Sequence, residues 1–309
     1  MKKLWGAAAM IAATMIWGGS FSAQSRGVRL VAPVLFTALR SALGALALAV
    51  VAALCDRLAR RRVTLFGAAE TPESRRELLR GGLWCGVFLA VASCLQQYGL
   101  KYTTAAKAGF LTTLYIVIVP LLGIFFRRRT SALLWGSAVL ALAGAYLLCG
   151  GVGSVGRGDV LVILCAFVFS AHILTIDRYA AKCDCVRLSC LQFAVASLLA
   201  FAGALAAGEP WVWEKIVAAL PYLLYAGIAG SAVAFTLQIV AQKFLHPVTA
   251  SLLMSLESVF AALGGWIFLQ EKLSLREFLG CAVILSAVIL SQLPPGSITS
   301  RLFSGSSRR

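Results

Sequence analysis

The sequence predicts an all-α, polytopic membrane protein with ten transmembrane helices, and three observations lead to that prediction. The 309 residues are 60% hydrophobic and 13% charged, with a mean hydropathy of +0.88, whereas soluble domains carry about 25% charged residues. The apolar residues form long blocks separated by short charged loops, as in helical membrane proteins. The sequence lacks the alternating segments of about ten residues that build a transmembrane β-barrel. A soluble protein is therefore excluded.

Ten apolar blocks follow one another, each of a length that can cross the roughly 30 Å hydrocarbon core of a bilayer as a helix. They span approximately residues 4–23, 33–54, 79–100, 105–126, 131–150, 158–177, 187–207, 218–240, 247–270 and 274–292. The first block resembles a signal peptide, because Lys2 and Lys3 precede an apolar run that ends in small residues. We expect it to stay uncleaved, since cleavage would leave nine helices. Residues 293–309 are rich in Ser, Gly and Arg and predict a disordered cytoplasmic tail.

Lysine and arginine are distributed unequally between alternate loops. One set of loops and termini contains 19 of the 28 basic residues, the other set contains 8, and Arg40 lies inside the second block. Because cytoplasmic loops carry the excess of basic residues, both termini are expected in the cytoplasm, which requires an even number of spans. The net charge of +16 therefore reflects membrane orientation, and nucleic acid is not an expected partner.

Nine cysteines lie mostly inside apolar blocks, where they act as small hydrophobic residues. Cys183 and Cys185 are close together in a loop, but two ligands make only a weak metal signal. We expect no structural zinc, no other metal, no cofactor and no disulfide.

The chain also contains an internal repeat. At an offset of 142 residues Gln96 aligns with Gln238, and at the same offset Tyr115 stands where Glu257 stands; at an offset of 152 Trp17 aligns with Phe169. The predicted halves, 1–150 and 158–292, have five helices each, and because five is odd the second half is inverted in the membrane. Inverted repeats are typical of secondary transporters, whose substrate site lies near the midplane where the repeats meet. Such symmetry gives two nearly isoenergetic arrangements, one open to each side.

Short motifs lie along nearly the whole chain: Trp17-Gly18-Gly19-Ser20-Phe21, Pro33 with Phe36 and Leu39-Arg40, Gln96-Gln97-Tyr98-Gly99-Leu100, Ala108 to Tyr115 with Pro120, Gly158-Asp159, Leu256 to Ala261, and Gln270-Glu271-Lys272-Leu273 followed by Gly280. In their order and spacing these motifs resemble the drug/metabolite transporter superfamily, in its EamA-type branch with ten helices. The resemblance implies a multi-pass permease of the plasma (inner) membrane that moves small organic solutes, often exporting amino acids or other metabolites. It also implies no use of ATP, and the chain has no phosphate-binding G-x-x-x-x-G-K-[ST] loop.

Glu257 is the first functional candidate, because an ionisable group in the middle of an apolar block is costly and needs a reason. Burial without a cation would favour its neutral form, and gain and loss of a proton could couple solute movement to the proton gradient. The alternative is a fixed pair, for instance with Arg40, that serves only packing. Arg40 itself could pair with Glu257, receive a substrate carboxylate, or extend towards the nearer interface.

The remaining candidates are neutral or aromatic. Gln96, Gln97 and Gln238 could line a cavity or form interhelical hydrogen bonds. Trp17 and Tyr115 could present ring faces to an apolar or cationic solute. His172 titrates near neutral pH, but a hydrogen-bonded histidine that packs helices together is an equal alternative.

The leading hypothesis is a secondary active transporter, an exporter or exchanger, of a small organic metabolite such as an amino acid or an amphipathic compound. Its expected partners are the solute, the lipid bilayer and protons as coupling ion, and a homo-oligomer stays open. One alternative is a membrane-embedded enzyme that uses Glu257 and His172 as acid and base, but the sequence offers no nucleophile or metal set for it. A receptor or scaffold that transports nothing is the third class.

Overall fold

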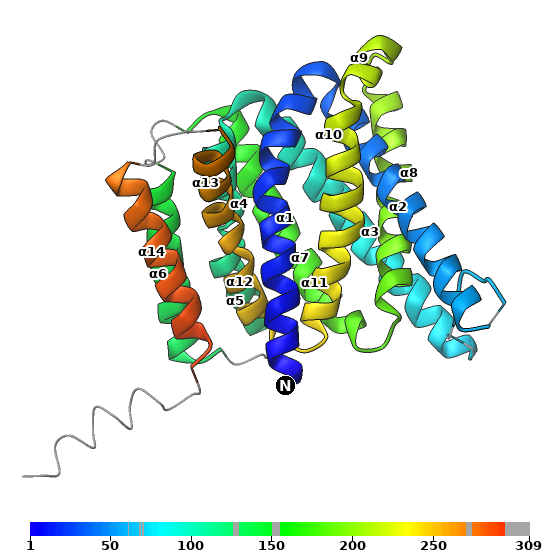
Figure 1. Ribbon diagram of the computed structural model, residues 1–309, viewed down its shortest axis with the longest axis horizontal. Coiled ribbons are helices and arrows are strands. Elements are labelled where there is room, and N and C mark those ends of the chain that lie inside the picture. The colour runs from blue at the N-terminus through cyan, green and yellow to red at the C-terminus, as the bar shows by residue number, and fades with distance from the viewer. Residues whose placement is uncertain are drawn as a thin grey trace, which may run out of the picture.

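The computed structural model describes residues 1–60, 62–67, 69, 71–125, 130–149, 155–269 and 274–293, and every regular element in these ranges is a helix. The elements are α1 (Lys2–Leu30), α2 (Pro33–Leu58), α3 (Pro72–Tyr102), α4 (Ala105–Thr112), α5 (Tyr115–Phe125), α6 (Ala132–Leu148), α7 (Arg157–Ala180), α8 (Cys185–Ala206), α9 (Trp213–Ala218), α10 (Leu220–Leu224), the π-helix η1 (Tyr225–Ala234), α11 (Phe235–Gln242), α12 (Pro247–Met254), α13 (Leu256–Leu269) and α14 (Leu275–Ser291). Figure 1 shows them side by side, running up and down across one bundle. Residues 294–309 of the expected tail and the motif residues 270–273 lie outside the described residues.

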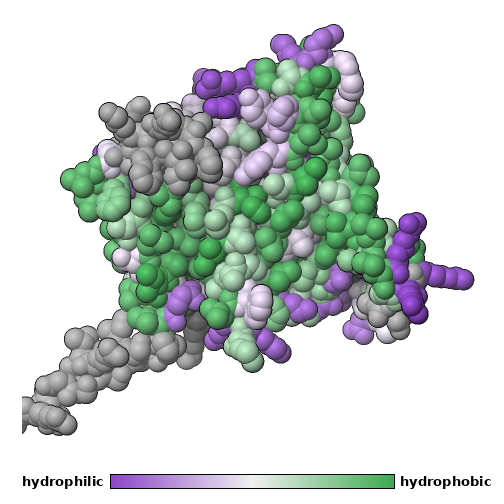
Figure 2. Space-filling view, viewed as in Figure 1, coloured by the Kyte–Doolittle hydropathy of each residue, from purple (hydrophilic) through white to green (hydrophobic). Residues whose placement is uncertain are grey.

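The chain is a helical, polytopic membrane protein. Within the described ranges, seven stretches are long and apolar enough to cross a membrane: α1, α2, α3, Lys107–Phe125, α7, α8 and Leu220–Gln242. Ala132–Leu148 and Pro247–Leu263 are apolar but shorter. Figure 2 shows hydrophobic side chains over the middle of the visible face and hydrophilic ones towards its two ends, as expected for a surface that contacts lipid. The count of ten spans stays a prediction.

The first helix is longer than its apolar block. Helix α1 continues to Leu30, so Arg26 and Arg29, expected in a loop, lie on its last turns. Val31 and Ala32 after it are not helical, and Ala32 directly precedes Pro33, a position that disfavours helical backbone angles.

Two blocks expected as single helices are each interrupted near their middle. The first of these helices is interrupted at Thr113 and Leu114, between α4 and α5, and the second at Ser255, between α12 and α13. The hydroxyl of Thr113 donates to the carbonyl of Phe110 (2.7 Å), and that of Ser255 donates to the carbonyl of Leu252 (2.6 Å). Such local bonds compete with regular helix hydrogen bonding, and the backbone tightens to bonds three residues apart at both breaks. Ser255 stands 142 residues after Thr113, which is the offset of the repeat.

Helices from the two halves of the chain pack against each other in antiparallel pairs. Helix α2 packs against α8, α6 against α14, α3 against α7, and α1 against η1 and α11. Glycines permit close backbone approach at two of these crossings. A Cβ on Gly144 would lie 2.9 Å from the carbonyl oxygen of Gly280, and a Cβ on Gly158 would lie 2.8 Å from that of Gly99.

Among the described residues, two ion pairs with buried carboxylates join the halves near opposite ends of the bundle. Lys107 on α4 contacts Asp159 on α7 at 2.6 Å, and Thr103 donates to the same carboxylate at 2.7 Å. At the other end Arg187 on α8 contacts Asp56 on α2 at 2.6 Å. Both carboxylates are buried, so these pairs fix α4 to α7 and α2 to α8.

Candidate functional site

A cavity lies at the level of the two helix breaks. The centre of a water-sized sphere can occupy about 50 Å³ of it, which is room for a few water molecules in this arrangement. Both halves of the chain line it, through Trp17, Ser20, Phe21, Gln24, Arg40, Gln96, Thr112, Tyr115, Phe169, Phe235, Gln238, Met254 and Glu257.

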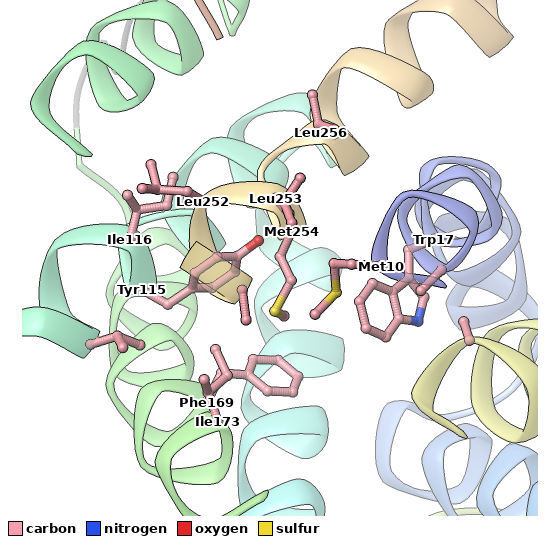
Figure 3. Close-up of a cluster of buried hydrophobic side chains, with 14 of the residues drawn as sticks. Met10, Trp17, Tyr115, Ile116, Phe169, Ile173, Leu252, Leu253, Met254 and Leu256 are labelled. Atoms are coloured by element: carbon pink, nitrogen blue, oxygen red, sulfur yellow. The ribbon is translucent and has the colours of Figure 1, made fainter. Parts of the chain in front are cut away.

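The breaks place residues of both halves on the cavity wall. Thr112 and Met254 are the last residues of α4 and α12, and Tyr115 and Glu257 stand at the beginning of α5 and α13. Each interrupted helix therefore contributes one residue before its break and one after it. Figure 3 shows Tyr115 on one side of Met254 and Trp17 on the other, with Phe169 nearby.

Tyr115 and Glu257, which the repeat alignment makes equivalent, contact each other. The Tyr115 hydroxyl donates to Oε1 of Glu257 at 3.2 Å, and both side chains are buried. No described cation forms an ion pair with Glu257. A carboxyl group in such surroundings is costly to charge, and it can hold a proton within the cavity.

Arg40 lies on the same cavity without pairing with Glu257. It is 5% exposed, and its Nε has no hydrogen-bond partner. Within the described ranges Arg40 forms no ion pair, so the alternative of a fixed Arg40–Glu257 pair is not observed. Because it lines the cavity, the alternative of an arginine extended into the interface is not observed either.

Amides and aromatic rings make up much of the remaining wall. Gln96 donates to the Thr112 hydroxyl at 3.3 Å, and Gln238 donates to Gln242 at 3.1 Å. The indole nitrogen of Trp17 donates to the carbonyl of Gly230 at 3.0 Å. Trp17 also packs edge-on against Phe235, with 4.9 Å between the ring centroids. These contacts hold the amide and indole groups in place on the cavity wall.

Six of the eight candidate residues predicted from the sequence line this cavity: Trp17, Arg40, Gln96, Tyr115, Gln238 and Glu257. Gln97 and His172 do not. Gln97 donates to the carbonyl of Gln24 at 3.2 Å, and Nε2 of His172 lies 3.0 Å from the amide oxygen of Gln192. Both side chains are fully buried and hydrogen-bond to a neighbouring helix. This agrees with the alternative, given for each of them, that they hold helices together.

Gln24 and Thr112 also line the cavity, although the sequence analysis did not select them. Gln24 is a polar residue within a mainly apolar helix, which is a signal that could have identified it. Thr112 has no comparable signal, because threonine is common in membrane helices as a local hydrogen-bond donor.

Comparisons with known proteins agree with this arrangement. The EamA-like transporter family matches residues 4–150 and again residues 156–293. An uncharacterized transporter of Archaeoglobus fulgidus is 32% identical over 221 residues, which is 69% of each chain. The threonine/homoserine exporter RhtA of Escherichia coli is 29% identical over 175 residues, 55% of this chain and 57% of its own. A solved crystal structure with 20% identity covers 96% of this chain and 98% of its own with a TM-score of 0.74 and shares the fold.

Proposed function

Because the chain belongs to the EamA-like transporter family, we propose that it is a secondary active transporter that moves a small organic metabolite through the cavity by alternating access. In this proposal ten helices form two inverted repeats, 1–150 and 158–292, and residues 293–309 form a cytoplasmic tail. Both termini face the cytoplasm. The relatives are bacterial and archaeal, which supports a location in the plasma membrane.

The observation that carries the proposal is the meeting of equivalent residues at one cavity. Tyr115 and Glu257 touch, Gln96 and Gln238 line the same wall, and all four obey the offset of 142. Residues related by a two-fold axis approach each other only near that axis. A site on the axis of two inverted repeats can open alternately to either side as one repeat moves against the other.

The helix pairs support the same symmetry. Exchanging the two halves maps α2 onto α8 and α6 onto α14, and each of these pairs packs together in antiparallel orientation. The same exchange converts the α3–α7 pair into the pair of α1 with η1 and α11, which is also observed. Two separate matches of the family, one in each half, agree with a duplicated unit.

Glu257 is the proposed proton-coupling residue. It is buried, its described hydrogen-bond partner is the neutral phenol of Tyr115, and it lies on the wall that the solute would contact. A carboxyl group that binds a proton when open to one side and releases it when open to the other would link solute flux to the proton gradient. The named activity of the RhtA relative supports export and an amino acid as solute.

Reconstituted protein tests the proposal. Sealed proteoliposomes are loaded with radiolabelled L-threonine, L-leucine or L-phenylalanine, and release is followed with and without an inward proton gradient. We expect release that the gradient accelerates, and we expect Glu257→Gln to lose that acceleration while it remains folded by size-exclusion chromatography. Glu214→Gln, on the exposed helix α9, is the matched control and should behave as the unaltered protein.

Three outcomes would contradict the proposal. Unaltered gradient dependence in Glu257→Gln would remove this residue from coupling. Chemical conversion of the solute without net movement would favour a membrane enzyme. Absence of flux for every solute tested would favour a receptor or scaffold.

A further inference from the structure

Arg40 is a buried cation without a described anion. An arginine stays protonated in proteins, and an unpaired charge within the membrane is expensive. The other deeply placed cations are compensated, because Arg187 holds Asp56 and Lys107 holds Asp159, each at 2.6 Å. Arg40 is 5% exposed, yet its Nε is unpartnered and it makes no ion pair with any residue that the structure describes.

The cavity offers Arg40 no anion of its own. The carboxyl group on the wall, Glu257, is hydrogen-bonded to Tyr115 and lies beyond ion-pair distance of Arg40. The other lining side chains are amides, hydroxyls, a thioether and aromatic rings. A molecule that occupies the cavity can therefore supply the anion that the described residues do not place beside Arg40.

The repeat shows that this cation belongs to one half only. Helices α2 and α8 begin at Pro33 and Cys185, which keeps the offset of 152, and Arg40 then corresponds to Gln192. Gln192 is neutral and is bonded to His172. Glu257 likewise corresponds to the neutral Tyr115. Each half thus contributes one ionisable group to the cavity, a cation from the first half and a carboxyl group from the second. The residue equivalent to each of these groups in the other half is neutral.

We propose that Arg40 binds the carboxylate of the transported solute. A guanidinium group presents parallel N–H donors that match both oxygens of a carboxylate. Glu257, separate from Arg40 on the same wall, is placed to receive an ammonium group when the solute carries one. The rings of Trp17, Phe169 and Phe235 surround the remainder of the solute. This assignment rests on the proposed transport function and narrows its solute to a small carboxylic acid or a zwitterion.

Binding to the purified, full-length protein tests the assignment. The probes are L-threonine, L-leucine and L-phenylalanine, each with its amino alcohol, which lacks the carboxylate, and its deaminated acid, which lacks the ammonium group. Stabilisation against thermal unfolding measures binding by mass action. We expect carboxylates to bind and amino alcohols not to bind. Equal binding by the deaminated acid identifies a monoanion site, whereas binding by the amino acid alone identifies a zwitterion site.

Variants separate recognition from folding. Removing one partner of a buried charge pair weakens binding by about 2–5 kcal/mol, which corresponds to a loss of affinity of about 30-fold or more for Arg40→Gln. Arg40→Lys keeps the charge but loses the paired donors, and it should bind more weakly than the unaltered protein and more tightly than Arg40→Gln. Arg57→Gln, exposed on the same helix, is the matched control and should retain full affinity.

The assignment is overturned if amino alcohols bind as well as amino acids, if Arg40→Gln retains carboxylate binding, or if none of the carboxylates binds. If Arg40→Gln does not fold, the ligand series and Arg40→Lys decide the question. Flux in proteoliposomes distinguishes this assignment from the transport proposal. Flux of a neutral solute that Arg40→Gln leaves unchanged refutes only the role of Arg40, whereas carboxylate binding without any flux refutes only transport.

Discussion

The hydrogen bond between Tyr115 and Glu257 predicts a measurable coupling energy between these two positions. The residues are 1% and 6% exposed, so Tyr115→Phe leaves a buried carboxyl oxygen without its donor. The separation of 3.2 Å is longer than the roughly 2.5–3.0 Å usual for O–H···O bonds, which places the interaction below the strongest cases. Hydrogen bonds between membrane helices contribute about 0.6 kcal/mol on average and about 1.7 kcal/mol at most. We expect a coupling energy between these two values.

The assay is a double-mutant cycle with Tyr115→Phe and Glu257→Leu, because leucine removes the acceptor and keeps a similar volume. Free energies of unfolding are measured by titration with sodium dodecyl sulfate in mixed micelles. Tyr146→Phe, exposed on α6, replaces Tyr115→Phe in a control cycle and should give additive effects. Additivity within about 0.3 kcal/mol in the Tyr115–Glu257 cycle would refute the contact and with it the meeting of equivalent residues on one axis.

Two further predictions concern the joints between the halves, and thermal unfolding in detergent checks both. Asp56→Asn breaks a buried ion pair and should cost about 3–5 kcal/mol, whereas Asp184→Asn, 42% exposed and 3.6 Å from the same arginine, should cost less than about 1 kcal/mol. Gly280→Ala places a Cβ 2.6 Å from the backbone nitrogen of Leu148 and should cost about 1–3 kcal/mol, but Gly136→Ala meets open space and should cost nothing. Equal losses within either pair would contradict the packing described.

Hydrophobic blocks predicted most of the helices. In a bilayer the backbone N–H and C=O groups of a long apolar segment find no water, so they must hydrogen-bond to each other within the helix. The boundaries and interruptions depend on more local causes. A single hydroxyl, that of Thr113 or Ser255, redirects a few backbone hydrogen bonds within a block whose composition hardly changes. The pattern of apolar residues is the same with or without such an interruption, so it does not predict either helix break.

The candidate site was predictable to the extent that the repeat was visible. The alignment identified Tyr115 and Glu257 as equivalent positions, but equivalence alone does not say how far apart two residues lie. Their contact depends on the position of the axis, which packing determines. His172 shows the opposite case, because the hydrogen-bond partner of its Nε2, Gln192, lies on another helix and holds the ring within the core. Nothing near His172 in the sequence distinguishes such a residue from one that faces a cavity.

The ion pair between Lys107 and Asp159 has a consequence for the transport cycle. It fixes α4 to α7 at one end of the bundle, and the positions equivalent to these residues in the other half are Thr249 and Ala7, which carry no charge. In the proposed cycle, movement of α4 away from α7 must separate this salt bridge, whereas the equivalent movement of α12 away from α1 separates no charged pair at the equivalent positions. Each difference of about 1.4 kcal/mol changes the ratio of the two arrangements tenfold. The two movements therefore differ in free energy, and the carrier favours the arrangement that keeps α4 against α7.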